Sequence, residues 1–365
     1  MKHQLAIVIV AIAAVIGLGA SGIRRATPLT LVYPANFGNR ISIPDDNPMT
    51  EEGVQLGRRL FYETRLSANN RVSCATCHQQ AKAFTDGLRF SQGVDDTPTP
   101  RNAMSLANLL WVRNFFWDGR AKGLEAQASF PLTDPHEMGQ SLAVSAQKLQ
   151  ADGRYASLFA QAFGTPQITG QRIVQALAQF ERTLISANSK YDQYLRGEYQ
   201  PTTSELNGLQ LFFSNPNAEK NIRGASCGHC HGGPKTFIEL FHNNGLDTVP
   251  ADKGREVITG QSIDRGRFRV ATLRNIALTA PYMHDGRFAN LEDVVDHYNE
   301  HIQPSETLST FLQGNQGGMG SAMSGRGDLQ LGLTTAERKD LLAFLHLLTD
   351  SSFIQDKRFS NPFIP

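Results

Sequence analysis

Two short cysteine–histidine motifs place the strongest constraint on this chain. Residues 74–78 read C-A-T-C-H and residues 227–231 read C-G-H-C-H, and both fit the C-x-x-C-H pattern that attaches a c-type haem. Two cysteines one helical turn apart can form thioethers to both vinyl groups of one porphyrin, and the histidine that follows becomes the proximal ligand of the iron. The expected haem-binding residues are Cys74, Cys77 and His78 for the first haem and Cys227, Cys230 and His231 for the second.

Two other chemistries also use closely spaced cysteines. A zinc site could take four thiolates, and a redox-active dithiol could use one pair. Neither requires a histidine directly after each pair, and a dithiol motif needs no second copy. The chain contains four cysteines and the two motifs use all of them. Two covalent haems are therefore the favoured interpretation, and we expect no disulfide.

The N-terminus predicts the compartment. A short basic start is followed by an apolar run from Leu5 to Leu18 and by small residues at 19–22, which is the layout of a signal peptide. The run is slightly short for a membrane span, but an uncleaved anchor is the alternative. Export agrees with c-type haem, which bacteria attach outside the cytoplasm. We expect residues 1–25 to be a signal peptide or N-terminal membrane tether, and the rest to be periplasmic.

Length and charge set broad limits. The 365 residues are enough for two domains with cores of their own. The formal net charge is +1, which gives no reason to expect nucleic-acid binding.

The stretch before the first motif is repeated before the second. Thr50 and Thr203 each open a helical pattern, and G-x-x-L-F recurs at 57–61 and 208–212. Further helices are expected at 102–110, 124–128, 141–150, 155–163, 171–186, 291–301 and 334–348, and a Gly/Ser-rich loop at 314–332. With few strand signals, the predicted fold is mostly α, with two cytochrome c-like haem domains and long loops. The expected division is a linker at 26–49, an N-terminal haem domain at 50–200, a C-terminal haem domain at 201–350 and a tail at 351–365.

The residues between the haem motifs resemble the bacterial di-haem cytochrome c peroxidase family, which includes MauG. The matching motifs are P-R-N at 100–102, F-W-D-G-R at 116–120, D-P-H-E-M at 134–138 and L-R-N-I-A-L-T-A-P-Y-M-H-D-G at 273–286. The resemblance extends over residues 50–349. It implies a peroxide site at the first haem and electron exchange at the second.

Two positions depart from the peroxidases of this family. Those proteins carry a histidine seven residues before the arginine of P-R-N, and it caps the first haem at rest. Here that position is Val94, and no histidine lies between His78 and His136. Where those proteins carry a methionine ligand for the second haem, this chain has Tyr298, as MauG-like members do. The resemblance therefore implies an open first haem that reacts without prior reduction.

The resemblance also implies catalytic residues. Glu137 matches the distal carboxyl group, and a buried carboxyl with a raised pKa is suited to move a proton between the two oxygens of peroxide. The alternative is a glutamate that complements a helix dipole. Gln127 would line the same pocket as a hydrogen-bond partner. Trp117 would lie between the haems and relay electrons, whereas Trp111 has no match and is interpreted as packing.

Further metal ligands follow from the same resemblance. Asn102, Thr279 and Pro281 match a calcium site between the haems, and amide and carbonyl oxygens suit that cation; the alternative is that they only form turns. For the second haem, a Tyr298 phenolate would stabilise oxidised iron, whereas methionine would raise the reduction potential. The competing ligands are His297, His301, Met283, Met319 and Met323, and His284 is expected near the haems in a supporting position.

Three functions are compatible with these features. The first is a periplasmic peroxidase that reduces hydrogen peroxide to water with electrons from a small c-type cytochrome or cupredoxin. The alternative is a MauG-like enzyme that uses peroxide to oxidise residues of a partner protein, and Val94 and Tyr298 support it. The third is a non-enzymatic electron carrier, which would need a residue that caps the first haem. Homodimers are common in the family, but the sequence does not reveal the oligomeric state.

Overall fold

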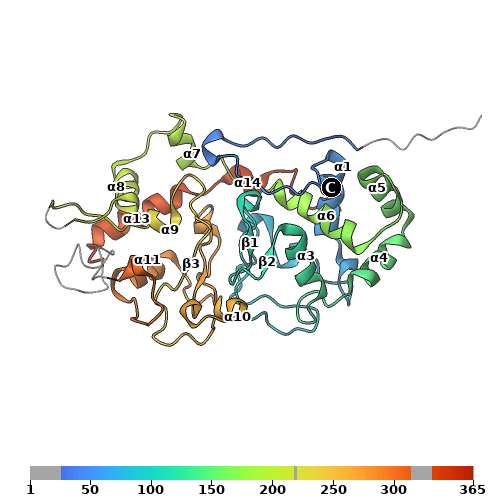
Figure 1. The fold of residues 1–365 in the computed structure, drawn as a ribbon. Helices are drawn as coiled ribbons and strands as arrows, with labels where there is room; N and C mark the ends of the chain where they lie inside the picture. Colours follow the sequence, from blue (N-terminus) through green and yellow to red (C-terminus); the bar gives the residue numbers. More distant parts are fainter. Residues whose placement is uncertain (1–25, 218–219, 314–330, 365) are drawn as a thin grey trace, which may run out of the picture.

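The computed structural model describes residues 26–217, 220–313 and 331–364. Within these ranges the chain is mostly helical, with two sheets of two strands each. Figure 1 shows two helical halves that lie on either side of these small sheets. The prediction of a mostly α fold is confirmed. The proposed signal peptide at 1–25 and most of the Gly/Ser-rich loop, with Met319 and Met323, lie outside the described residues.

The first half contains α1 to α6 and one hairpin. The helices are α1 Glu51–Phe61, α2 Cys74–Cys77, α3 Leu124–Thr133, α4 Leu142–Gln150, α5 Gly153–Phe163 and α6 Gly170–Arg182. Strands β1 Asn114–Phe115 and β2 Ala121–Lys122 pair antiparallel, with Phe115 opposite Ala121. Helix α7 (Lys190–Leu195) leads to the second half.

The second half follows the same plan. Its helices are α8 Thr203–Phe213, α9 Gly228–His231, α10 Glu256–Thr259, α11 Leu291–Glu300 and α13 Thr335–Leu347, and α14 Ser351–Gln355 follows them. Strands β3 Phe241–His242 and β4 Phe268–Arg269 pair antiparallel, with His242 opposite Phe268. The short 3-10 helices are η1 Ala35–Phe37, η2 Thr64–Leu66, η3 Gln80–Lys82, η4 Leu109–Trp111, η5 Ser262–Asp264, η6 Ile276–Leu278 and η7 Thr310–Leu312.

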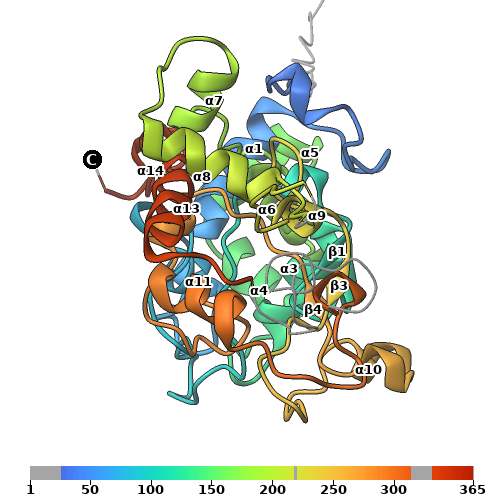
Figure 2. The same ribbon diagram turned by 90° about the vertical axis from the view of Figure 1, so that its left-hand side faces the viewer.

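The repeated G-x-x-L-F segment forms the same helix crossing twice. Helix α1 packs on α6, and α8 packs on α13; Figure 2 shows the second pair side by side. In each crossing the glycine permits the contact, because a Cβ on Gly57 would overlap the carbonyl of Ala176 and a Cβ on Gly208 would overlap that of Asp340. The leucine and phenylalanine of each copy are packed in the crossing. The internal repeat in the sequence therefore corresponds to a repeated packing unit.

Three expected helices have different bounds. The stretch 102–110 is not helical apart from the start of η4. The Asn102 carbonyl, which a helix would pair with the amide four residues on, instead accepts from the Trp117 indole (2.9 Å), and the Asn102 amide donates to the carbonyl of His284 in the other half (2.8 Å). The helix expected at 171–186 ends at Arg182, and Leu184 beyond it is buried. The helix expected at 124–128 continues to Thr133 and includes Pro131.

The segments before and after the haem domains pack against the first half. Phe37, within the predicted linker, is buried, and the amide of Ser42 donates to the carbonyl of Leu110 (3.2 Å). Phe353 and Phe359 are buried in the core of the first half. The Tyr62 hydroxyl donates to the Phe359 carbonyl at 2.7 Å. Each half has its own hydrophobic core, and the division near residue 200 stays a prediction.

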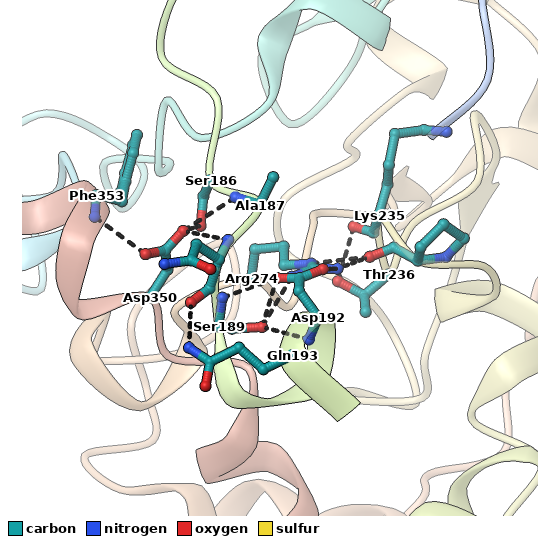
Figure 3. Close-up of polar contacts among 12 residues, drawn as sticks. Ser186, Ala187, Ser189, Asp192, Gln193, Lys235, Thr236, Arg274, Asp350 and Phe353 are labelled. Carbon is teal, nitrogen blue, oxygen red and sulfur yellow. Dashed lines mark hydrogen bonds and ion pairs between the residues drawn. The ribbon is translucent and has the colours of Figure 1, made fainter. Parts of the chain in front are cut away.

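A buried polar network joins the two halves, as Figure 3 shows. The Arg274 guanidinium is fully buried, pairs with Asp192, and donates to the Ser189 hydroxyl (3.0 Å) and the Pro234 carbonyl (2.8 Å). One carboxyl oxygen of Asp350 accepts from the amides of 187 and 188, both at 2.9 Å. The connection after α6 is thereby fixed to residues far along the chain.

The helices of the described ranges are too short or too polar to cross a membrane. The predicted N-terminal anchor is not part of those ranges.

The helix crossing in the second half gives a test of the repeat. Replacement Gly208→Ala places a methyl group against the Asp340 carbonyl, and overpacking of this kind costs about 1–3 kcal/mol. We expect a lower denaturant midpoint in chemical unfolding followed by circular dichroism. Gly153→Ala is the control, because nothing lies within 4 Å of its added Cβ. Equal midpoints for the two variants would contradict the close crossing.

Candidate haem sites and the region between them

Each C-x-x-C-H motif opens onto its own cavity. The first cavity, of about 600 Å³, is lined by Cys74, Cys77 and His78 together with residues of α3 and α6. The second, of about 240 Å³, is lined by Cys227, Cys230 and His231 together with residues of α11 and α13. Both are apolar over most of their walls, as cofactor sites usually are.

The two proximal histidines have the same environment. The Nδ1 of His78 lies 2.8 Å from the Phe84 carbonyl oxygen, and the Nδ1 of His231 lies 3.2 Å from that of Thr236. Burial lowers the pKa of both imidazoles, that of His231 to about 4. A neutral ring that donates from Nδ1 keeps a lone pair on Nε2, which is the arrangement required of an iron ligand. The residues therefore fit a haem at each motif.

The cysteine environments do not fit the two alternatives. The pairs line different cavities, so they do not form one four-thiolate zinc site. No group of three or more His, Cys, Asp or Glu residues within the described ranges could hold a metal. Burial raises the pKa of the Cys77 and Cys230 thiols to about 11. A redox-active dithiol needs the opposite shift, because the thiolate is the reactive form.

Glu137 lies in a turn that is held from both sides. Its amide donates to the Asp134 carbonyl (3.1 Å), and its own carbonyl accepts from the amide of Val94 (2.9 Å). A Cβ on Gly93 would overlap the His136 carbonyl, so the two loops are in close contact. Burial and, to a smaller extent, the nearby Asp134 charge raise the pKa of Glu137, while Arg120 acts in the opposite direction. Its carboxyl lines the first cavity.

The first cavity is also lined by other polar groups, and among the described residues no second histidine lines it that could bind the iron. Gln127 lines it, as predicted, beside Glu137. The only histidine among the described residues that line it is His78. Val94 is half-buried and does not line the cavity. A second carboxyl group, Glu181 on α6, was not predicted; it is buried, and burial raises its pKa to about 8.

Tyr298 projects from α11 into the second cavity. Its hydroxyl lies 3.1 Å from the Nδ2 of Asn244. Burial raises the pKa of Tyr298 to about 12, and the Asn244 hydrogen bond acts in the opposite direction. Met283 lines the same cavity. Of the candidates that the resemblance and the sequence suggested, Tyr298 and Met283 line this space; His242, which the sequence did not single out, lines it too.

The competing histidines have other partners. The Nε2 of His297 lies 3.1 Å from the Asn244 carbonyl oxygen. His301 is exposed and pairs with Asp296. His284 is buried, stacks on Phe268 with ring centroids 3.7 Å apart, and lines the second cavity. His284 thus lies on the wall of the second cavity, and its supporting role stays a prediction.

Trp117 and Arg269 line both cavities and the small space between them. The amide of Arg269 donates to the Trp117 carbonyl at 2.7 Å, which joins strand β4 to the hairpin β1–β2. The Trp117 indole donates to the Asn102 carbonyl at 2.9 Å. Trp111, in contrast, is buried in the first half and donates to the Gly38 carbonyl.

Arg269 is a candidate site residue that the sequence did not reveal. Its side chain is 7% exposed, and its Nε has no hydrogen-bond partner among the described residues. Burial lowers its pKa to about 10. A buried guanidinium without a paired anion is costly, and haem propionates would supply the missing charge. This orphaned cation is a further feature that fits haem on either side.

The three predicted calcium residues lie together. Asn102, Thr279 and Pro281 line the same small cavity of about 80 Å³ between the haem cavities. The Nδ2 of Asn102 donates to the Leu88 carbonyl at 2.8 Å, which leaves its Oδ1 as an acceptor. Oxygen donors of this type suit a hard cation, and the geometry is compatible with the predicted site.

Comparison with known proteins identifies relatives of one type. The family model of di-haem cytochrome c peroxidases matches residues 51–200. The methylamine utilization protein MauG of Methylorubrum extorquens is 36% identical over 309 residues, covering 84% of this chain and 80% of that protein. The cytochrome c551 peroxidase of Nitrosomonas europaea is 35% identical over 254 residues, covering 68% of this chain and 73% of that protein.

Solved structures agree with these relatives. A MauG-like protein associated with microbial copper homeostasis is 41% identical, with a TM-score of 0.78, and the match covers 92% of this chain and 99% of that one. The diheme peroxidase BthA of Burkholderia thailandensis shares the fold. It is 24% identical, with a TM-score of 0.69, and the match covers 84% of this chain and 88% of that one.

The position of Arg269 gives a test that does not depend on turnover. Replacement Arg269→Leu removes the only guanidinium among the described residues that lines both cavities, and loss of a nearby cation disfavours the reduced, more electron-rich haem. We expect lower reduction potentials in spectroelectrochemical titration of the holoprotein. Arg269→Lys keeps the positive charge, so its reduction potentials should stay close to those of the wild type. Unchanged potentials in the leucine variant would contradict the contact with propionates.

Proposed function

This chain belongs to the di-haem cytochrome c peroxidase family, and on that basis we propose that it reduces hydrogen peroxide with electrons taken from a partner protein. The first haem is the proposed peroxide site and the second the proposed point of electron entry. The observation that carries the proposal is the first cavity, in which the Glu137 carboxyl faces a space that no histidine except His78 lines among the described residues.

The residues that would hold the cofactors are those of the two motifs. His78 and His231 would bind iron through Nε2, the four cysteines would form the thioethers, and Arg269 would pair with propionates. When bound, the haem supplies the iron at which peroxide is reduced and the capacity to store oxidising equivalents. The protein supplies position and proton transfer.

Glu137 is the proposed proton carrier. Cleavage of the peroxide bond requires that a proton leave the oxygen nearer the iron and reach the other oxygen, which departs as water. A carboxylate with a raised pKa accepts that proton more readily than an ordinary glutamate does and can return it. The amide of Gln127 is available to hydrogen-bond the oxygens and orient them. The absence of a capping histidine at Val94 supports reaction in the fully oxidised protein.

Electrons would reach the first haem through the region around Trp117. The indole ring lies on the wall of both cavities and is fixed by its hydrogen bond to the Asn102 carbonyl. A rigid aromatic side chain in that place shortens the path through which the two haems exchange electrons. We propose that Tyr298 is the sixth ligand of the second haem, because it lines the same cavity as His231.

Of two sources for the electrons, we favour residues of a partner protein, as in the MauG-like alternative. Tyr298 supports this choice, since an anionic phenolate stabilises oxidised iron and lets both haems share the oxidising equivalents. The match at 41% identity to a MauG-like protein points the same way. The peroxidase reading, with a small c-type cytochrome or cupredoxin as donor, is the second candidate and is favoured by the relative from Nitrosomonas.

Three accompanying proposals follow from the sequence. A calcium ion bound by Asn102, Thr279 and Pro281 would hold the segment next to Trp117. A signal peptide or anchor at 1–25 would place the protein in the periplasm, where c-type haem is attached. The haem domains would extend over 50–200 and 201–350.

The function is tested by adding one equivalent of hydrogen peroxide to the fully oxidised holoprotein. We expect reaction without prior reduction, with simultaneous loss of the electron paramagnetic resonance signals of both haems. Trp117→Phe should uncouple the two signals, whereas Trp111→Phe, a buried tryptophan away from the cavities, should not. A protein that reacts only after reduction would contradict the open first haem.

The same mixture separates the two electron sources. If residues of a partner protein are the substrate, the oxidised state should persist without a donor, and Tyr298→Phe should shorten its lifetime. The opposite outcome is that a reduced small cytochrome returns the oxidised protein rapidly to its resting spectrum, over many turnovers, in both wild type and Tyr298→Phe. The peroxidase candidate is then the better one.

Glu137 gives a prediction for pH. The carboxylate is the form that accepts a proton, so the second-order rate constant with peroxide should fall as pH falls through the raised pKa of Glu137. Glu137→Gln should remove this transition and slow the reaction by roughly 10²–10⁴-fold. Because the Asp134 charge raises that pKa, Asp134→Asn should move the midpoint to lower pH.

The matched control is Glu181→Gln, which removes another buried carboxyl group that lines the same cavity. Stopped-flow rates between pH 4 and 9 should keep the low-pH transition in this variant. If the transition disappears in Glu181→Gln and remains in Glu137→Gln, the proton carrier is Glu181, and our assignment to Glu137 is wrong.

A further inference from the structure

One amide side chain in the second cavity contacts both candidate iron ligands. The Nδ2 of Asn244 lies 3.1 Å from the Tyr298 hydroxyl and 3.4 Å from the Met283 sulfur. All three residues line the cavity that contains His231. The two side chains therefore share one donor on one side of the space where the second haem would lie.

Asn244 is itself held firmly. Its carbonyl oxygen lies 3.1 Å from the Nε2 of His297. On one side, the Asn243 side chain donates to Thr307 at 2.9 Å. On the other side, a Cβ on Gly245 would lie 2.6 Å from Ile302, so this backbone is in close contact with the segment after α11. The Asn244 amide is thus presented from a fixed backbone.

The two candidate ligands differ in how they respond to this donor. A phenolate oxygen is a hard anion, and an N–H that donates to it makes a charge-assisted hydrogen bond. A thioether sulfur is soft, neutral and a weak acceptor. Hydrogen bonding to a charged form favours that form. The Asn244 amide therefore stabilises Tyr298 as an anion far more than it stabilises Met283.

We propose that Asn244 is a positioning residue that selects Tyr298 over Met283 as the sixth ligand of the second haem iron. It does so by donating a hydrogen bond to the phenolate oxygen. The inference rests on the second-haem site of the proposed function, and it names the residue on which the identity of that ligand depends. Without the amide, the neutral thioether of Met283 competes for the iron and raises the reduction potential of this haem.

The test uses oxidised holoprotein without peroxide. Asn244→Leu keeps the size of the side chain and removes the donor, and Asn244→Ala provides a smaller second variant. Magnetic circular dichroism in the visible and near infrared distinguishes phenolate from thioether ligation of ferric haem, and spectroelectrochemistry gives the potential. We expect the phenolate signature in wild type, and a thioether signature with a higher potential in both Asn244 variants.

Two further variants assign the competing ligand. Asn244→Leu combined with Met283→Leu should lose the thioether signature, whereas Met283→Leu alone should keep the wild-type phenolate signature. Met138→Leu, at a methionine that lines the first cavity and not the second, is the matched control and should leave the second haem unchanged.

Three results would overturn the proposal. The first is that both Asn244 variants keep the phenolate signature and the potential of the wild type. The second is that the thioether signature survives in the double variant, and the third is that Tyr298→Phe leaves the wild-type spectrum unaltered. The reaction of the same samples with peroxide reports on the first haem separately, because Asn244 does not line that cavity. A failed ligand assignment is thereby distinguished from a failed peroxide site.

Discussion

The ion pair between Arg274 and Asp192 fixes the two halves in one relative position. A buried guanidinium is tolerated only with a partner, and breaking such a pair costs about 3–5 kcal/mol because the remaining charge is left uncompensated. Arg274 belongs to the second half and Asp192 to the connection that follows the first. Trp117 and Arg269 approach the space between the cavities from opposite halves, so the shape of this space depends on the relative position of the halves. A small relative shift would separate the Trp117 carbonyl from the Arg269 amide.

The two halves use one scaffold to build two different sites. Each has a glycine-mediated helix crossing and a neutral proximal histidine hydrogen-bonded to a backbone carbonyl. They differ on the other side of each cavity, where loops rather than the repeated helices supply the side chains. The loop before α4 brings Glu137 to the first cavity, and α11 with the Asn244 loop brings a phenol to the second. Shared packing and separate loops allow one fold to build two different sites in a single chain.

Much of this arrangement was readable from local sequence. The repeated G-x-x-L-F segments and the helical patterns at 171–186 and 334–348 are short-range patterns, and α1, α8, α6 and α13 lie at these places. Motif matching also brought Glu137, Gln127 and Trp117 to the walls of the first cavity, and Asn102, Thr279 and Pro281 to one small cavity.

Other features depend on contacts that no local pattern encodes. The stretch 102–110 does not form the expected helix, and its first residue is bonded elsewhere: the Asn102 carbonyl accepts from the Trp117 indole, and the Asn102 amide donates to His284, some 180 residues away in the sequence. Arg269 lies in a two-residue strand, where an arginine is ordinarily a solvated residue. Asn244 lies in a polar, glycine-containing stretch after β3, where an asparagine is ordinarily a loop residue. Glu181 looks like the polar edge of an amphipathic helix, and its burial follows only from how α6 lies against the cavity.

The packing of Phe353 and Phe359 against Phe84 has a consequence for how the protein matures. Chains emerge from the ribosome and from an export channel in order, and early domains usually fold first. Here the first hydrophobic core lacks two of its aromatic residues until nearly three hundred residues after its own haem motif have been made. Both motifs would then be accessible to the haem-attachment machinery before that core closes, and truncation after α13 would leave an exposed apolar surface on the half that carries the peroxide site.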